Sequence, residues 1–227
     1  IYLSYNMTLV ESSKELLSKQ LQENKKIPAT LDTSELKKHY ESIDKKLLTI
    51  NKFLKARGIK TIVKNEGGEA NSDILSVEEI GKFYEGYLNK MIDYVAFTPM
   101  GYPHFGAITS GYGHRENPFT GENVETHKGL DFRGKRGEIV KSTASGKVTY
   151  AGRRGGYGNC IVINHGNGFE TYYGHLSRIL ISEGAQVKAG DNIGKIGSTG
   201  RSTGPHLHYE IHKNGKIINP RSFLTLE

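Results

Sequence analysis

Glycine is distributed unevenly along this chain, and this distribution most constrains what the chain can fold into. Residues 1–97 contain 5 of the 28 glycines, whereas residues 98–227 contain 23. Glycine within a helix costs about 1 kcal/mol relative to alanine, but it readily forms the turns between short strands. We therefore predict an α+β chain, with a helical N-terminal region over 1–97 and an antiparallel β domain over 98–227.

A regular spacing of apolar residues supports the helical prediction for the first region. Over residues 34–57 six of them recur at alternating steps of four and three, which is a heptad pattern that requires a packing partner. They are Leu36, Tyr40, Ile43, Leu47, Ile50 and Leu54. We expect an earlier helix over residues 8–22 to pack antiparallel against this seam. Residues 76–79 resemble a capping box and predict a further helix that ends at about Asp93.

The second region contains short alternating or β-branched runs that are separated by glycine turns. This pattern is typical of strands, and its spacing favours an antiparallel sheet without helical crossovers. The predicted strands are 147–150, 159–164, 169–173, 192–196 and 207–212.

Two short histidine clusters lie far apart in this region, His127-Lys-Gly-Leu-Asp131 and His206-Leu-His208. On a strand, side chains two or four positions apart point to the same side, so each cluster can converge on one ion. Imidazole and carboxylate groups are zinc ligands, and a catalytic zinc uses three protein ligands and one open position. The residues alone do not decide between His206 and His208 as the third ligand.

Several motifs together resemble the LytM or lysostaphin-like zinc metallopeptidases, peptidase family M23. They are His127-Lys-Gly-Leu-Asp131, Tyr173-Gly-His175-Leu and Gly204-Pro-His206-Leu-His208-Tyr-Glu210, within a likeness that runs from about Thr98 to Pro220. The resemblance implies that His127, Asp131 and His208 bind Zn²⁺. It also implies that His175 and His206 are catalytic. The sequence has no His-Glu-x-x-His motif, so we expect histidines to transfer the protons.

The resemblance further implies a zinc metalloendopeptidase that cleaves peptide cross-links of peptidoglycan in the periplasm or cell envelope of a Gram-negative bacterium. Links between D-alanine and diaminopimelate are favoured over polyglycine bridges, through likeness to cell-shape-determining endopeptidases. The alternative function is that of a non-catalytic relative which binds cell wall or activates another hydrolase. Such relatives typically lack some of the five site positions, all of which this chain retains.

Net charge separates the two regions as well. Residues 1–97 carry 15 basic and 14 acidic side chains, and residues 98–227 carry 16 and 10, so their net charges are +1 and +6. The basic residues are scattered and lack interleaved aromatic residues, which favours an anionic cell-wall polymer over nucleic acid as partner. The sequence contains no apolar run long enough to span a bilayer, but it begins at Ile1, so we expect that a signal peptide or membrane anchor can lie upstream.

The N-terminal region has two competing interpretations. It can act as a scaffold or dock a protein partner, including another copy, through its helices. Alternatively, the loop around Gly67 and Gly68 can cover the groove and place Asn65 or Glu66 on the open zinc position. The regular heptad seam favours scaffolding or docking over occlusion, because such a seam requires a packed helix.

Other candidate residues are interpreted as structural. We predict that Cys160 is a small core residue and that the Gly197–Gly204 loop connects two strands beside the active site. The histidines outside the motifs are predicted to lie on the surface or in turns, with His165 in a hairpin turn. They are His39, His104, His114, His165 and His212. His212 and Glu210 share the strand face of His208, so either could support that ligand.

Overall fold

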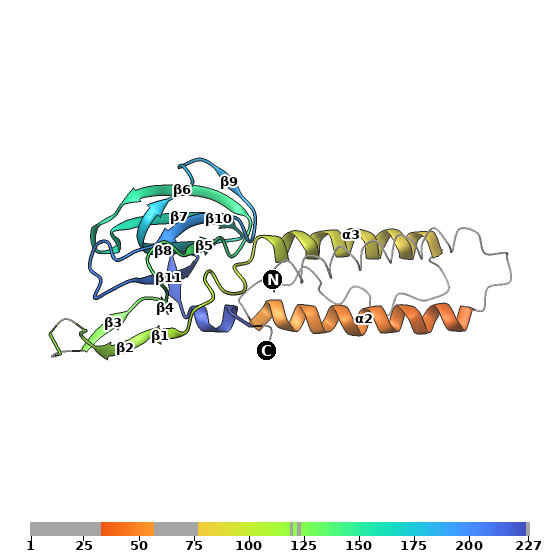
Figure 1. Ribbon diagram of the computed structural model, residues 1–227. Coiled ribbons are helices and arrows are strands. Elements are labelled where there is room, and N and C mark those ends of the chain that lie inside the picture. Colours follow the sequence, from red (N-terminus) through yellow and green to blue (C-terminus); the bar gives the residue numbers. More distant parts are fainter. Residues whose placement is uncertain (1–32, 57–76, 119, 122–123, 226–227) are drawn as a thin grey trace. The chain divides into compact units, whose positions relative to one another are not determined.

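The computed structural model of the chain describes residues 33–56, 77–118, 120–121 and 124–225 (Figure 1). These residues belong to two compact units, which divide between Ile92 and Asp93. The first contains helices and the second is dominated by antiparallel sheet, which confirms the α+β fold class.

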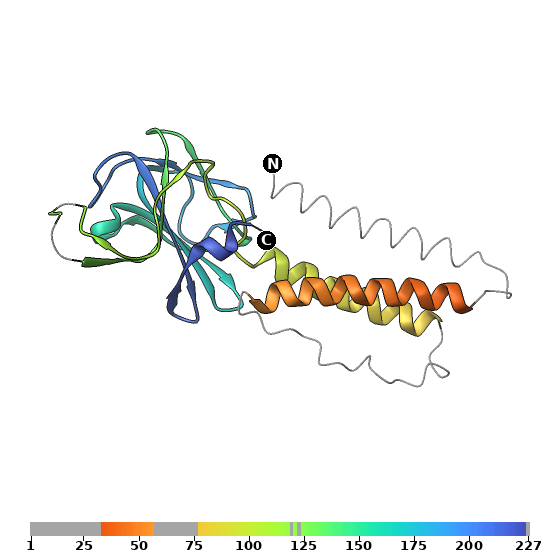
Figure 2. The ribbon, with the colours of Figure 1, turned by 90° about the horizontal axis from the view of Figure 1, so that it is seen from below.

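The two described helices of the first unit lie side by side and run in the same direction (Figures 1 and 2). The rings of Tyr40 and Tyr84 stack with their centroids 5.3 Å apart, and the Tyr84 hydroxyl donates to Asp44 at 2.8 Å. Leu47 of the heptad seam is buried. Tyr40 of the seam therefore packs on the later helix, whereas Ile50 of the seam is 39% exposed. The antiparallel partner predicted over residues 8–22 lies outside the described residues. The helices are α2 (Thr33–Ala56) and α3 (Val77–Ala96).

Helix α3 confirms the helix predicted from the capping box, and it extends three residues beyond Asp93. Just after its end the buried Thr98 hydroxyl donates to the carbonyl oxygen of Tyr94 at 2.6 Å. That bond satisfies a carbonyl group of the last turn, which has no partner within the helix. Neither described helix is long and apolar enough to cross a bilayer.

The second unit contains a ten-stranded sheet and a separate two-stranded hairpin, and every described strand pairing is antiparallel. The main path through the sheet is β1-β4-β11-β8-β7-β6-β9, and β12, β5 and β10 pair outside it. The strands are β1 (Ile108–Ser110), β2 (Gly113–Glu116), β3 (Val124–His127), β4 (Leu130–Arg133), β5 (Ile139–Lys141), β6 (Gly146–Arg153), β7 (Asn159–Gly166), β8 (Phe169–Ile179), β9 (Gln186–Val187), β10 (Asn192–Ile196), β11 (His206–Lys213) and β12 (Lys216–Ile218).

The five strands predicted from the sequence correspond to β6, β7, β8, β10 and β11, and within the described residues no α-helix connects them. Strands β1 to β5, β9 and β12 are too short, at two to four residues, to give a readable alternation.

Strands β4 and β11 are neighbours, and each has one apolar and one polar face. Apolar side chains on these strands are at most 1% exposed, as expected for the core face of an alternating strand. They are Leu130, Phe132, Leu207, Tyr209 and Ile211. The intervening positions hold charged or polar groups that point to the opposite face. The alternation thus places Asp131, Arg133, His206, His208 and Glu210 together on that face.

His165 is not in a turn, as the sequence had suggested, but is a core residue of β7 that is 1% exposed. Its Nδ1–H donates to the carbonyl oxygen of Ser145 at 2.8 Å, and its Nε2 lies 2.7 Å from the Thr171 hydroxyl. Burial lowers the pKa of His165 to about 4, and the bond to Ser145 offsets only part of that effect. The hairpin turn, Asn167 and Gly168, begins two residues later.

The buried His165 predicts a loss of stability in mild acid. Its pKa is about 4 in the folded chain and about 6.5 when unfolded, so unfolding takes up a proton between these values. Its contribution is therefore complete above pH 6.5 and is lost as pH falls toward 4, by about 3 kcal/mol. Urea denaturation across this range should show a smaller pH dependence for His165→Asn than for the natural chain. The exposed His114→Asn is the control, and an unchanged slope in His165→Asn would contradict this role.

Candidate active site

A groove of about 640 Å³ lies over the polar face of β4 and β11. All five residues that the sequence singled out for the site line this groove, although they come from four different strands. They are His127, Asp131, His175, His206 and His208. The ten-stranded sheet and the β2–β3 hairpin thus bring together residues that are up to 81 positions apart in the chain.

His127 and Asp131 do not share one strand, contrary to the simple spacing argument. His127 ends β3 and Asp131 lies on β4, with the turn of Lys128 and Gly129 between them. A Cβ atom on Gly129 would lie 2.3 Å from the carbonyl oxygen of Tyr209, so only glycine allows the turn this close to β11. The close turn is what brings His127 back over the sheet.

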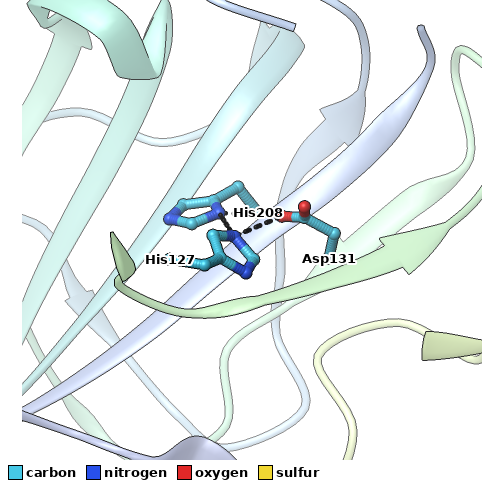
Figure 3. Close-up of side chains that lie close together, drawn as sticks. All are labelled: His127, Asp131 and His208. Atoms are coloured by element: carbon cyan, nitrogen blue, oxygen red, sulfur yellow. Dashed lines mark hydrogen bonds and ion pairs between the residues drawn. The ribbon is translucent and has the colours of Figure 1, made fainter. Parts of the chain in front are cut away.

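Three side chains converge on one point of the groove (Figure 3). Asp131 lies directly opposite His208 in the β4–β11 ladder. The Asp131 Oδ1 atom is 2.8 Å from His208 Nδ1 and 3.2 Å from His127 Nε2, and these two ring nitrogens are 3.1 Å apart. All three residues are buried, and they form a possible metal-binding group.

The outer nitrogens of both rings are occupied, which fixes the orientation of each imidazole. The Nδ1–H of His127 donates to the carbonyl oxygen of Gly111 at 2.6 Å, and the Nε2–H of His208 donates to Glu210 Oε1 at 2.9 Å. In the neutral rings, His127 Nε2 and His208 Nδ1 therefore present lone pairs toward the carboxylate of Asp131. Three acceptors that face each other require a positive charge between them.

The electrostatics of this cluster favour a positive charge. Burial alone would lower the pKa of His208, but hydrogen bonds to Asp131 and Glu210 raise it to about 9. Burial would likewise raise the pKa of Asp131, but hydrogen bonds from His127 and His208 hold it far below its ordinary value. A cation can replace the proton that the cluster otherwise binds, because metal ligands must be deprotonated.

The donor set fits zinc. Two imidazole nitrogens and one carboxylate oxygen are the ligands of a catalytic zinc site. Ligands at the usual 2.0–2.1 Å from a tetrahedral zinc lie about 3.3 Å from one another. The separations of 2.8 to 3.2 Å between these donors need only a small expansion to reach that value.

Glu210 fixes His208 from behind. Besides the bond from His208, its carboxylate accepts hydrogen bonds from the Tyr157 hydroxyl at 2.9 Å and from His212 Nε2 at 2.7 Å. Burial would raise the pKa of Glu210, but these bonds lower it to about 2, so the group is ionised. The sequence suggested Glu210 or His212 as the residue that supports the candidate ligand His208. Glu210 contacts His208 directly, and His212 contacts Glu210.

Arg115 is a site residue that sequence reasoning did not identify. Its guanidinium lies 3.2 Å from Asp131 Oδ2 and 3.0 Å from Glu125 Oε1, so it holds the carboxylate oxygen that faces away from the histidines. Arg115 lies on β2 and Glu125 on β3, and the hairpin register pairs them directly. Arg115 lies within the stretch from Thr98 to Pro220 that resembles the family, but nothing in the sequence shows that it reaches Asp131.

His175 and His206 form a second pair in the groove, with ring centroids 4.8 Å apart. The Nδ1–H of His175 donates to the carbonyl oxygen of Thr199, and that of His206 to Gly204, each at 2.8 Å. In each neutral ring Nε2 therefore carries a lone pair, and His206 Nε2 is 3.7 Å from Asp131 Oδ1. Burial lowers the pKa of His175 to about 4, so this ring is neutral at pH 7.

The backbone of His175 is also unusual, with a φ of 61°. A left-handed conformation is uncommon for a residue other than glycine, and such strain is concentrated at functional sites. The hydrogen bond to Thr199 ties this residue to the loop between β10 and β11. That loop lines the groove, as predicted for the Gly197–Gly204 segment.

The remaining predicted residues lie outside the cluster. Cys160 is completely buried, and burial raises its pKa to about 12, which confirms a core role and excludes a reactive thiolate at pH 7. His114 is exposed on β2, and His104 is held between Glu138 and the carbonyl oxygen of Ile139. The side chain of His39 lies outside the described residues.

Comparison with known proteins gives matches to the second unit. Residues 125–220 match peptidase family M23. A Neisseria meningitidis protein named DD-carboxypeptidase/endopeptidase Mpg is 48% identical over 115 residues, which cover 51% of this chain and 26% of that protein. The Escherichia coli murein hydrolase activator NlpD is 40% identical over 115 residues, covering 47% of this chain and 30% of that protein. The chain therefore spans less than a third of the length of these relatives.

Among solved structures, the catalytic domain of lysostaphin from Staphylococcus simulans is 37% identical to this chain. The match covers 52% of this chain and 92% of that domain, with a TM-score of 0.48.

The support from Glu210 predicts a specific effect on metal affinity. Glu210→Gln keeps the shape of the side chain but removes the charge that orients His208, so zinc affinity should fall about 10- to 100-fold. Competition with a chromophoric chelator measures this change. Glu138→Gln is the matched control, because that carboxylate pairs with His104 away from the three converging side chains. Equal affinities in Glu210→Gln and in the natural chain would contradict the role of Glu210.

Proposed function

We propose that this chain, which belongs to peptidase family M23, is a zinc-dependent endopeptidase that hydrolyses peptide cross-links of bacterial peptidoglycan. The observation that carries the proposal is the arrangement of two groups in one groove. One group presents three inward-facing acceptors, and the other presents two histidines whose Nδ1–H groups are hydrogen-bonded to backbone carbonyls, so that Nε2 carries the lone pair. A hydrolase needs both a place for the metal and groups that move protons.

In this proposal His127, Asp131 and His208 hold the metal. Zinc supplies a water nucleophile near neutral pH and a Lewis acid for the scissile carbonyl. Arg115 and Glu210 position the ligands by their contacts with Asp131 and His208. Their role is to keep the donor atoms converged when substrate enters.

His175 and His206 perform the proton transfers. Both rings present Nε2 to the groove, so one can accept a proton from the attacking water while the other, when protonated, donates to the developing oxyanion. The lowered pKa of His175 keeps it able to accept a proton at pH 7. The hydrogen bonds to Thr199 and Gly204 stabilise each ring as its Nε2 becomes protonated.

We infer that the cross-link between D-alanine and diaminopimelate is the substrate. The name of the Neisseria relative, a DD-carboxypeptidase/endopeptidase, supports this choice over a polyglycine bridge. The net charge of +6 in residues 98–227 suits an anionic cell-wall polymer. Such a substrate places the protein outside the cytoplasm, in the periplasm or cell envelope of a Gram-negative bacterium.

The alternative is a non-catalytic protein that binds cell wall or activates another hydrolase, and the name of the NlpD relative supports it. An activator does not need five histidine and aspartate side chains arranged for catalysis. This chain has all five, with the outer nitrogens of its site histidines hydrogen-bonded. We therefore favour the enzyme.

Substitutions should separate metal binding from proton transfer. His175→Ala and His206→Ala should each keep zinc but lose about 100- to 10,000-fold in turnover, since this is the usual contribution of an acid or base. His208→Ala should lose zinc and activity together. Muropeptide release from purified peptidoglycan and metal content measure the two effects, with His114→Ala as the control. Failure of the natural, zinc-loaded chain to release any muropeptide would favour the activator.

For residues 1–97 we propose a helical scaffold that docks a protein partner. Leu48 and Ile50 on α2 are 60% and 39% exposed, so this helix offers apolar side chains for a contact. The competing interpretation is that Asn65 or Glu66 covers the groove. Removal of residues 1–97 should leave cell-wall cleavage unchanged if they form a scaffold or dock a partner. An increase in cleavage would instead support occlusion.

A further inference from the structure

We propose that Arg133 binds a substrate carboxylate next to the scissile amide, and so selects diaminopimelate cross-links. This inference rests on the proposed function and deepens it. It starts from the β4–β11 ladder, in which Asp131 lies opposite His208 and Arg133 lies opposite His206. Residues directly opposite in an antiparallel pair point to the same face, with Cβ atoms about 5 Å apart. Arg133 is therefore the cross-strand neighbour of a catalytic histidine.

The backbone of Arg133 is held in place by the sheet. Its neighbour Phe132 is completely buried in the core, so alternation directs Arg133 to the groove, whose wall it forms. The backbone N–H of Arg133 donates to the carbonyl oxygen of Ala107 at 2.8 Å, on the side of β4 away from β11. The guanidinium thus extends from a rigid strand, while its exposed surface remains accessible to a ligand.

The charge of Arg133 distinguishes it from the other arginines of the groove. Arg115 is neutralised by Glu125 and Asp131, and Arg201 lies 3.0 Å from Glu125. Within the parts of the chain that the structure describes, Arg133 has no acidic side chain within ion-pair distance. A guanidinium beside the catalytic histidines that lacks a partner is suited to an anion supplied by the substrate.

The chemistry of the cross-link provides such an anion. In a bond between D-alanine and diaminopimelate, the carbon that bears the leaving amine also bears a free carboxylate. An interior glycine–glycine bond has no charged group at the equivalent position. A guanidinium next to His206 can bind that carboxylate through two parallel hydrogen bonds, which orients the leaving amine toward the proton donors.

The test uses a pair of cross-linked muropeptides that differ only in this group. One carries the free carboxylate beside the scissile amide, and the other carries a carboxamide there, while their terminal carboxylates are the same. The natural chain should cleave the acid with a kcat/KM about 10- to 100-fold higher than the amide, as expected for a hydrogen-bonded charge pair. Arg133→Gln should lower kcat/KM on the acid to that on the amide, and Arg133→Lys should retain part of the preference.

Lys128→Gln is the matched control. Lys128 also lines the groove and is also exposed, but it lies in the turn after His127 rather than opposite His206. This variant should keep the ratio between acid and amide. Three results would overturn the proposal: equal cleavage of both peptides by the natural chain, an equal loss on both peptides in Arg133→Gln, or an equal loss of preference in Lys128→Gln.

Binding measurements separate this inference from the proposed function. Calorimetry with the zinc-loaded His175→Ala variant compares the affinities for the two peptides without cleavage. Tighter binding of the acid, lost in His175→Ala/Arg133→Gln, supports the carboxylate site even if the natural chain cleaves neither peptide. In that case only the enzyme assignment fails. Equal binding of acid and amide would show that Arg133 does not recognise the carboxylate.

Discussion

The pairing of β4 with β11 is the constraint on which the site depends. This one ladder sets Asp131 opposite His208 and Arg133 opposite His206, and it places Leu130, Phe132, Leu207 and Tyr209 in the core behind them. A slip by one residue would turn the polar side chains of a strand into the core and its apolar side chains into the groove. The burial of the core therefore fixes the register that the chemistry requires.

The same alternation explains how a polar cluster is tolerated beside the core. Each buried site group has a defined partner: Gly111 for His127, Glu210 for His208, Arg115 for Asp131 and Thr199 for His175. Because these partners occupy the outer atoms, the lone pairs of His127, Asp131 and His208 point toward one another. The space between these three side chains therefore favours a positive charge. A buried polar network is costly unless its groups are satisfied, and a bound cation would satisfy the inner groups here.

The sequence predicted the parts of this arrangement that depend on local pattern. Glycine content separated the helices from the sheet, and alternation placed His206 and His208 on one face of β11. The parts it missed depend on tertiary contacts. The turn at Gly129 exists because β11 passes close to it, Arg115 reaches Asp131 because of the hairpin register, and His165 is buried because Ser145 and Thr171 satisfy its ring. None of these neighbours is adjacent in the sequence.

The central claim is that the three converging acceptors form a zinc site. X-ray absorption at the zinc edge, combined with metal analysis of the purified chain, tests it most directly. We predict one zinc per chain, with two imidazole nitrogens and oxygen ligands at about 2.0–2.1 Å, and loss of this zinc in His127→Ala as in His208→Ala. A chain that binds no zinc, or a zinc whose imidazole signal is unchanged in His127→Ala, would contradict the account.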